Sequence, residues 1–254
     1  MRRRVRTALA GVLLAASAAS AIAQGYEGEG EADPKNNIAY DGRFTFARIK
    51  YHREPSGWNQ GRPDIKWDHD YPRAEINFTR ILEELTTLRP FTGGSNIFTL
   101  DDPELTRYPL AYMAEPGFWT LTDEEAAGLR AYLLKGGFII FDDFAGPQWL
   151  HFETQMRRVL PEARLVLLDA SHPIFDAFYR IEALEFRSAY GNLRPLFYGI
   201  FEDNDPSRRL LAIINYNNDI AEYWEFSGSG YYPVSLSNEA YKLGINYVIY
   251  GMTR

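Results

Sequence analysis

Two adjacent aspartates, Asp142 and Asp143, end the apolar run GGFIIFDDFAGPQW (136–149). Carboxylates in such a position can serve as general acid and base, and one of them can be a nucleophile. If the strand continues through both residues, however, their side chains point to opposite faces of the sheet. They can share a ligand only if the strand has already ended and turned. In the structural alternative, one aspartate caps the next helix and the other accepts loop N–H bonds.

The segment DASHPIF (169–175) contains the second candidate, His172. The proline that follows biases His172 toward an extended conformation, which is typical of a loop or a strand end. In one interpretation His172 transfers protons or contacts a ligand beside the aspartates. In the other, the segment is a helix entry, with Asp169 or Ser171 as the cap and Pro173 at the first helical position.

The segment KWDHDYP (66–72) places Asp68, His69 and Asp70 in a row, and all three are competent metal ligands. Neighbouring side chains diverge in extended chain, and no second histidine follows at helical spacing. A loop with Asp70 near a helix start therefore explains the residues better, and we predict no metal site. Asp70 stays a candidate ligand contact. Trp149 is another, because tryptophan can stack on a sugar, although core packing explains it equally well.

Several sequence motifs are missing. The chain has no G-x-G-x-x-G and no phosphate loop ending in Gly-Lys, and GSG at 228–230 lacks the frame of a serine nucleophile elbow. The absence of cysteine excludes disulfides, thiolate metal sites and a cysteine nucleophile. We therefore predict no cofactor.

The N-terminus has the pattern of a secretory signal peptide over residues 1–23. Arg2, Arg3, Arg4 and Arg6 precede a short apolar run, and Ala21-Ile22-Ala23 supplies the small residues of a cleavage site. We expect an exported protein that is periplasmic or extracellular after cleavage near Ala23, with no membrane span in the mature chain. Residues 24–37 are acidic and glycine-rich and predict a flexible leader, followed by one domain over 38–254.

Charge argues against one class of partner. Cleavage would remove four arginines and no acids, which takes the formal charge from −7 to −11. Such a chain repels phosphate backbones, so we expect no nucleic-acid binding.

The chain after the leader alternates strand-like and helix-like segments. Pro72 opens a helix with Phe78, Ile81, Leu82 and Leu85 on one stripe. Thr122 and Glu125 match a capping box, and a helix follows until Gly136-Gly137. The segment 237–252 is a largely apolar helix. Short apolar runs predict strands at 44–51, 96–100, 109–114, 138–141, 163–168, 196–201 and 210–215. This alternation predicts a three-layer α/β sandwich with a mostly parallel sheet, where ligands collect beyond the carboxyl ends of the strands.

Five segments, in order, resemble the bacterial family called domain of unknown function 4159. They are FTFARIKY, DYPRAEINFTRILEELT, LDDPEL with YPLAYM, LTDEEAAGLRAYLLKGGFIIFDDFAG and HPIFDAFYRI. That family is similar in turn to the class I glutamine amidotransferase-like superfamily, including the ThuA-like proteins. The resemblance implies a flavodoxin-like fold. It also implies that Asp143 lies closest to the position of the amidotransferase nucleophile, a cysteine that this chain lacks.

Two hypotheses about function follow. In the first, an exported, non-catalytic amidotransferase-like domain binds a polar small molecule or an envelope protein in a strand-end crevice around Asp142, Asp143 and His172. In the second, the protein is a hydrolase acting on a carbohydrate or envelope component, with Asp143 as nucleophile or base and His172 as its helper. A structural accessory of an envelope assembly is a third possibility. The first two hypotheses predict different geometry: the hydrolase requires Asp143, His172 and Asp70 to lie within hydrogen-bond reach of one another, directly or through one water.

Overall fold

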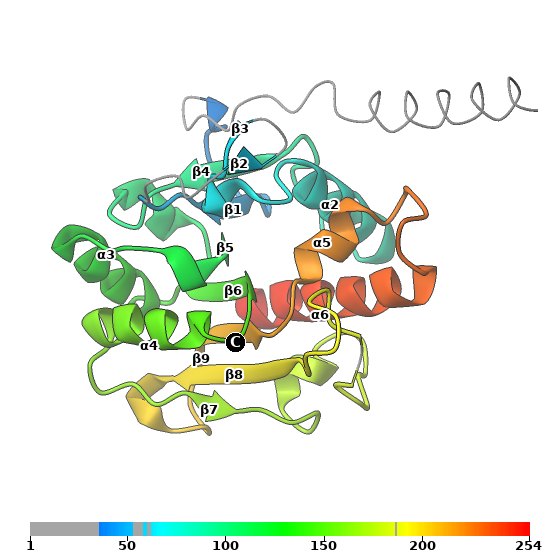
Figure 1. Cartoon of the computed structure of the whole chain (residues 1–254). Coiled ribbons are helices and arrows are strands. Elements are labelled where there is room, and N and C mark those ends of the chain that lie inside the picture. Colours follow the sequence, from blue (N-terminus) through cyan, green and yellow to red (C-terminus); the bar gives the residue numbers. More distant parts are fainter. Residues whose placement is uncertain (1–35, 53–57, 60–61, 186) are drawn as a thin grey trace, which may run out of the picture. The chain divides into compact units, whose positions relative to one another are not determined.

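The computed structural model describes residues 36–52, 58–59, 62–185 and 187–254. Residues 1–35, which include the predicted signal peptide and most of the predicted leader, lie outside the described residues, so these two predictions stay untested. A seven-stranded sheet has the order β4-β1-β5-β6-β9-β8-β7 (Figure 1). Its strands are β1 (Phe46–Ile49), β4 (Ser95–Phe98), β5 (Leu110–Ala114), β6 (Phe138–Phe144), β7 (Val166–Leu167), β8 (Leu196–Phe201) and β9 (Leu210–Tyr216). Two short strands, β2 (Trp58–Asn59) and β3 (Arg62–Pro63), form a separate hairpin.

The sheet is mostly parallel, as predicted. Strands β4, β1, β5, β6 and β9 pair in parallel, whereas β8 pairs antiparallel with both β9 and β7. The strand expected over 163–168 is shorter than predicted and covers only Val166–Leu167. It lies at the sheet edge, where Leu167 is 58% exposed, so little burial favours a longer strand there.

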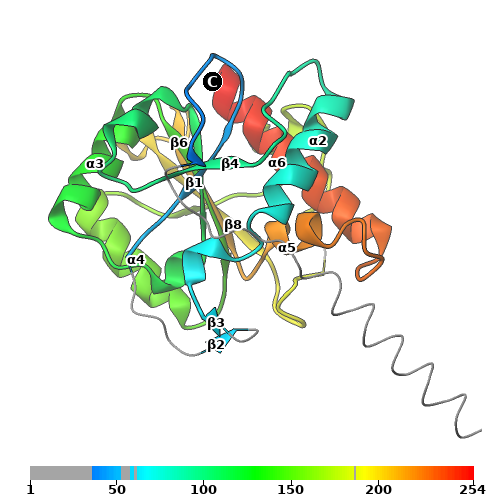
Figure 2. The same ribbon diagram turned by 90° about the horizontal axis from the view of Figure 1, so that it is seen from above.

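Helices cover both faces of the sheet, which makes the fold a three-layer α/β sandwich. Figure 2 shows α3 and α4 on one side and α2, α5 and α6 on the other. Strand β6 alternates between two hydrophobic clusters, because Phe138 and Ile140 pack on the second side and Ile139 and Phe141 on the first. The helices are α2 (Arg73–Leu85), α3 (Asp123–Leu134), α4 (Gln148–Val159), α5 (Ile220–Glu225) and α6 (Val234–Thr253). None of the helices described is both long and apolar enough to span a membrane.

Two helices show how local sequence sets the elements. The capping box of Thr122 and Glu125 is present at the start of α3, and the helix ends before Gly136, whose φ of +119° requires glycine. Helix α2 departs from its predicted stripe. Its Phe78 and Leu82 are buried, but Leu85 is 49% exposed.

The strand order reverses beside β1. From β1 the chain crosses through α2 to β4 on one side, and then returns to β5 on the other side. Ligands of open α/β sheets collect at the carboxyl ends of strands where the order reverses in this way. The loop after β1, the end of β5 and the end of β6 meet at this edge.

Candidate functional site

Asp143 occupies a β-bulge at the carboxyl end of β6. Phe141 pairs with Ile214 and Phe144 pairs with Tyr216, so β6 contains one residue more than β9 over this stretch. Asp143 has a φ of 61°, in the left-handed region. A bulge re-aims a side chain relative to the pleat. The strand therefore runs through both aspartates. Because of the bulge, however, their side chains need not point to strictly opposite faces of the sheet, which was the argument against a shared ligand.

Asp142 is buried in the core, and its hydrogen-bond partners give it a structural role. Its carboxylate accepts hydrogen bonds from the Tyr112 hydroxyl at 2.9 Å and the Asn215 amide at 3.0 Å. It also accepts from the backbone N–H groups of Ile220 at 3.0 Å and Ala221 at 3.3 Å. Burial raises the pKa of Asp142 to about 6, although these four donors lower it. Asp142 thus satisfies the first N–H groups of α5, rather than those of the next helix in the chain.

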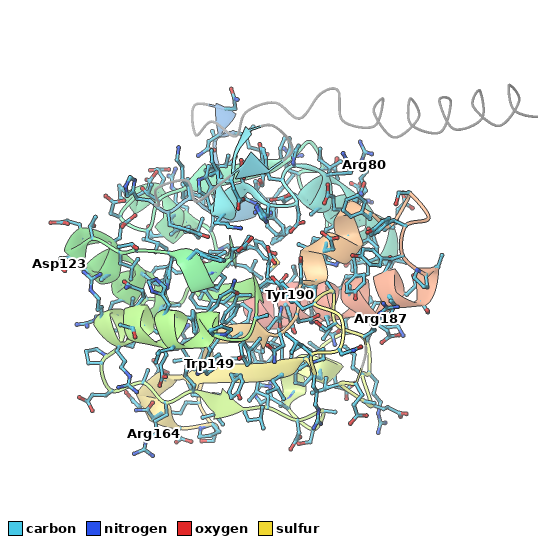
Figure 3. The ribbon with its side chains drawn as sticks, in the orientation of Figure 1. Arg80, Asp123, Trp149, Arg164, Arg187 and Tyr190 are labelled. Carbon is cyan, nitrogen blue, oxygen red and sulfur yellow. The ribbon has the colours of Figure 1, made fainter. Side chains whose placement is uncertain are left out.

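Asp143 faces a different set of groups. Its side chain is buried and accepts a hydrogen bond from the hydroxyl of Tyr190. Tyr190 is labelled in Figure 3. Oδ2 lies 3.8 Å from Nδ1 of His69. Burial and the charge of Glu115 raise the pKa of Asp143 to about 8, against the opposing effect of His69. Asp143 is therefore protonated at neutral pH unless a cation binds beside it.

His69 is a doubly paired imidazolium. Its Nδ1 lies 2.7 Å from Oε1 of Glu115, the residue directly after β5, and its Nε2 lies 2.8 Å from Oδ1 of Asp64. Both nitrogens must carry protons to donate to these carboxylates. Burial would lower the pKa of His69, but Glu115, Asp143 and Asp64 raise it to about 9. Lys66 pairs with the same carboxylates, at 2.7 Å from Asp64 and 3.2 Å from Glu115.

Asp143 also meets two further carboxylates, those of Asp70 and Asp219. Oxygen atoms of Asp70, Asp143 and Asp219 all lie within 4.8 Å of one another. Burial and the charge of Asp143 raise the pKa values of Asp70 and Asp219 well above the ordinary range. Among the described residues, Oδ2 of Asp70 is buried with no hydrogen-bond partner. Asp70, Glu222 and Glu225 form an adjoining group of the same kind. We call Asp70, Asp143 and Asp219 the acidic triad.

The spacing of the acidic triad suits a single cation. Ca²⁺ binds oxygen ligands at about 2.3–2.6 Å, so two ligands on opposite sides of one ion are at most about 5 Å apart. The three oxygens fall within that limit. Buried carboxylates packed so closely need a compensating charge, either protons or a bound cation.

A buried ion pair holds the loop that carries His69 and Asp70. Arg48 of β1 and Glu75 of α2 form a salt bridge with no exposed side-chain area. The same guanidinium donates to the backbone carbonyls of Trp67 at 2.8 Å and His69 at 2.9 Å. Arg48 therefore holds the loop between β1 and α2 in place by hydrogen bonds to its backbone carbonyls.

His172 lies at the opposite end of the sheet from Asp143. Its ring contacts Phe201 and Tyr250, and the Tyr250 ring contacts Phe138 at the start of β6. Asp143 lies five positions after Phe138 along β6, a rise of about 16 Å. The Nδ1 atom of His172 accepts from the Ile174 N–H, and Pro173 begins a 3-10 turn. The segment is thus a helix entry with Pro173 at its first position, as in the second interpretation, but the cap is His172 itself and not Asp169 or Ser171. The histidine beside Asp143 is His69.

Trp149 packs in an aromatic cluster on the α4 side of the sheet (Figure 3). Its ring lies 4.6 Å from that of Tyr198 and 4.7 Å from that of Tyr216, between centroids. These contacts explain its partial burial by packing against the core. The structure gives it no contact with the acidic triad among the interactions of the described residues.

Sequence reasoning missed three residues of this edge: Glu115, Tyr190 and Asp219. Glu115 directly follows the apolar strand PLAYMA, and Asp219 follows the end of β9 by three residues. An acidic residue just beyond a buried strand was the available signal, the same one that identified Asp143. Tyr190 lies in an irregular segment and has no such signal.

The raised pKa values predict that stability falls as pH rises. Asp143 keeps its proton in the folded chain up to about pH 8, whereas an unfolded aspartate loses it near 3.8. His69 likewise stays protonated to about pH 9. The folded state binds more protons than the unfolded state, so both contributions are present at low pH and are lost through these pKa values. We expect the melting temperature, measured without divalent cations, to decrease between pH 5 and 9.

The variant Asp143→Asn should flatten this pH profile, while Asp101→Asn, an exposed aspartate outside the site, should leave it unchanged. A melting temperature that rises from pH 5 to 9 in the parent protein would contradict the assigned protonation states.

A comparison with protein families matches most of the chain. No curated protein matches the chain. The family model described as "Domain of unknown function (DUF4159)" matches residues 45–252, from just before β1 to the last turn of α6. The match includes the acidic triad, His69 and Glu115. The chain therefore belongs to the DUF4159 family of domains of unknown function.

Proposed function

We propose that this protein is an exported, non-catalytic domain that binds a divalent cation with Asp70, Asp143 and Asp219. The observation that carries the proposal is the meeting of three carboxylates from three separate chain segments within 4.8 Å. An all-oxygen ligand set suits Ca²⁺, Mg²⁺ or Mn²⁺ better than Zn²⁺. The raised pKa values indicate that protons neutralise these carboxylates when no cation is present. A bound cation would supply the neutralising charge instead.

The histidine acts in this proposal as a fixed counter-charge. Both nitrogens of His69 are engaged by Glu115 and Asp64, so neither has a free lone pair for a metal. His69 and Lys66 pair closely with Glu115 and Asp64, whereas the nearest cationic atom to the acidic triad in these pairs is Nδ1 of His69, 3.8 Å from Asp143. The ligand would therefore bind beside His69, with the triad as its contacts.

We also propose that the domain has a flavodoxin-like fold, and its resemblance to class I amidotransferase-like proteins supports this. Asp143 has a left-handed backbone in the bulge near the end of β6, one residue before the strand ends, and is comparable in this respect to the strained turn of a nucleophile elbow. A mostly parallel sheet with its site at the carboxyl edge is also what a flavodoxin-like fold requires. Export rests on the residue pattern of 1–23, and N-terminal sequencing of protein recovered outside the cytoplasm tests it.

A hydrolase is the alternative, and one observation favours it. A carboxyl group with a pKa of about 8 is a proton donor at neutral pH, and His69 lies 3.8 Å away. The same protonation makes Asp143 a poor nucleophile, and His69, already protonated, cannot act as a base. We therefore favour binding without covalent chemistry.

Calcium, magnesium and manganese titrations test the proposal. We expect at least one of these ions to raise the melting temperature of chelator-treated protein, with about 2.7 kcal/mol of stabilisation at 100 times the dissociation constant. Binding should tighten as pH rises, because the cation displaces protons. The measurement is differential scanning fluorimetry, with isothermal titration calorimetry for the affinity.

A matched pair of variants identifies the site. Asp219→Asn keeps an N-cap side chain for α5 but removes a ligand charge, and should abolish the response. Asp101→Asn makes the same chemical change outside the site and should preserve it. If no ion stabilises the parent protein, or if both variants respond alike, the proposed function is wrong.

A further inference from the structure

A second candidate site is a groove between α2 and α6. It differs from the acidic triad because its lining is mostly apolar. The groove has a volume of about 530 Å³, within the range of about 300–1,000 Å³ that small-molecule pockets occupy. Most of its surface is apolar, and Ile81, Leu85, Tyr241 and Ile245 contribute to the lining. Leu85 is the residue that leaves the buried stripe of α2, and at 49% exposure it is one wall of this groove.

Charge in the groove is opposite to that of the protein as a whole. Its lining contains Arg80 and Lys242 and no acidic residue, whereas the chain has a formal charge of −7. Lys242 is paired with Glu239 at 2.7 Å. For Arg80, labelled in Figure 3, no ion pair occurs among the described residues. Arg80 is thus available to an anion.

A buried hydroxyl provides an independent observation. Ser237 of α6 lines the groove, is 3% exposed, and has an Oγ without a hydrogen-bond partner among the described residues. An unsatisfied buried polar group costs about 1–3 kcal/mol. A ligand with an acceptor atom that reaches Ser237 would remove that cost.

We propose that this groove binds an amphiphilic carboxylate, a medium-length apolar chain with one anionic end. The chain would cover the exposed faces of Leu85 and Val234, which are 49% and 69% exposed. The carboxylate would pair with Arg80, whose guanidinium can hold it by two hydrogen bonds, and the same carboxylate would accept a further hydrogen bond from the Ser237 hydroxyl. This inference is independent of the proposed cation site.

Isothermal titration of the chain from Gln24 with decanoate, below its micelle concentration and in the presence of a chelator, tests the proposal. We expect a single site. Arg80→Glu should weaken binding at least tenfold, while Arg89→Glu, the same charge change on an exposed residue outside the lining, should not. Ser237→Ala should weaken binding several-fold. Asp219→Asn should bind decanoate like the parent, so that failure of the cation site is distinguishable.

Val234→Glu gives a second test that should leave the fold intact. Val234 is exposed at the first turn of α6, where a carboxylate interacts favourably with the helix dipole. The new charge should repel the ligand and weaken binding at least tenfold. The proposal is overturned by an absence of binding, by equal affinity for decanol, or by equal losses in Arg80→Glu and Arg89→Glu. A dimer that Val234→Glu dissociates would also overturn it, because a second copy would then cover the groove.

Discussion

Replacing Arg48 with methionine is expected to lower the free energy of unfolding by about 3–5 kcal/mol. The reason is that Glu75 would keep a buried carboxylate with no cation beside it, since neither side chain of the pair has any exposed area. The carbonyls of Trp67 and His69 would also lose their donor. Chemical denaturation at pH 7, with two-state analysis, measures the loss.

The double variant Arg48→Met/Glu75→Met separates this effect from cavity formation. Replacing both members of a buried ion pair with apolar residues is often neutral, so most of the lost stability should return. Arg107→Met is the exposed control, because its pair with Glu104 is solvated and should contribute less than about 1 kcal/mol. A loss below 1 kcal/mol in the single variant would show that Glu75 is not held as a buried ion.

The loop held by Arg48 also carries Asp70, so the double variant has a second use. It restores packing but not the hydrogen bonds to the loop carbonyls. We expect it to respond to divalent cations more weakly than the parent, even where its stability has recovered.

Replacement of the two adjacent aspartates is expected to have opposite effects. Asp142→Ala should destabilise the domain by about 3 kcal/mol or more, because it removes the acceptor of four buried donors: the Tyr112 hydroxyl, the Asn215 amide and two N–H groups of α5. Asp143→Asn should preserve or raise stability above pH 8 in chelator, because it removes a carboxylate whose ionised form the site disfavours.

Thermal and chemical unfolding of both variants at pH 6 and pH 9 provide the measurement. Asp143→Asn can still accept a hydrogen bond from Tyr190, so a gain at pH 9 and a smaller change at pH 6 are expected. It should at the same time lose its cation response. If Asp143→Asn were as destabilised as Asp142→Ala at both pH values, Asp143 would be a structural residue and the proposed site would not stand.

The sequence by itself determined the elements whose causes are local. The capping box of Thr122 and Glu125 and the glycines at 136–137 set both ends of α3, because hydrogen bonds and backbone freedom within a few residues decide a helix terminus. The unbroken apolar run before Asp142 likewise indicated a strand covered on both faces, and the alternation of strands and helices indicated the mostly parallel sandwich.

Only the tertiary structure decided which polar residues meet. Asp143 reaches the edge because one extra residue in β6 forms a bulge against β9, and bulges depend on the register between two strands that are about 70 residues apart. His69 and His172 could not be ranked from the sequence, because both flank a proline-containing segment and their positions depend on the direction of β1, β6 and β8. Asp70, Asp143 and Asp219 come together because parallel strands align their carboxyl ends, and strand order, which the sequence did not provide, fixes which ends are neighbours.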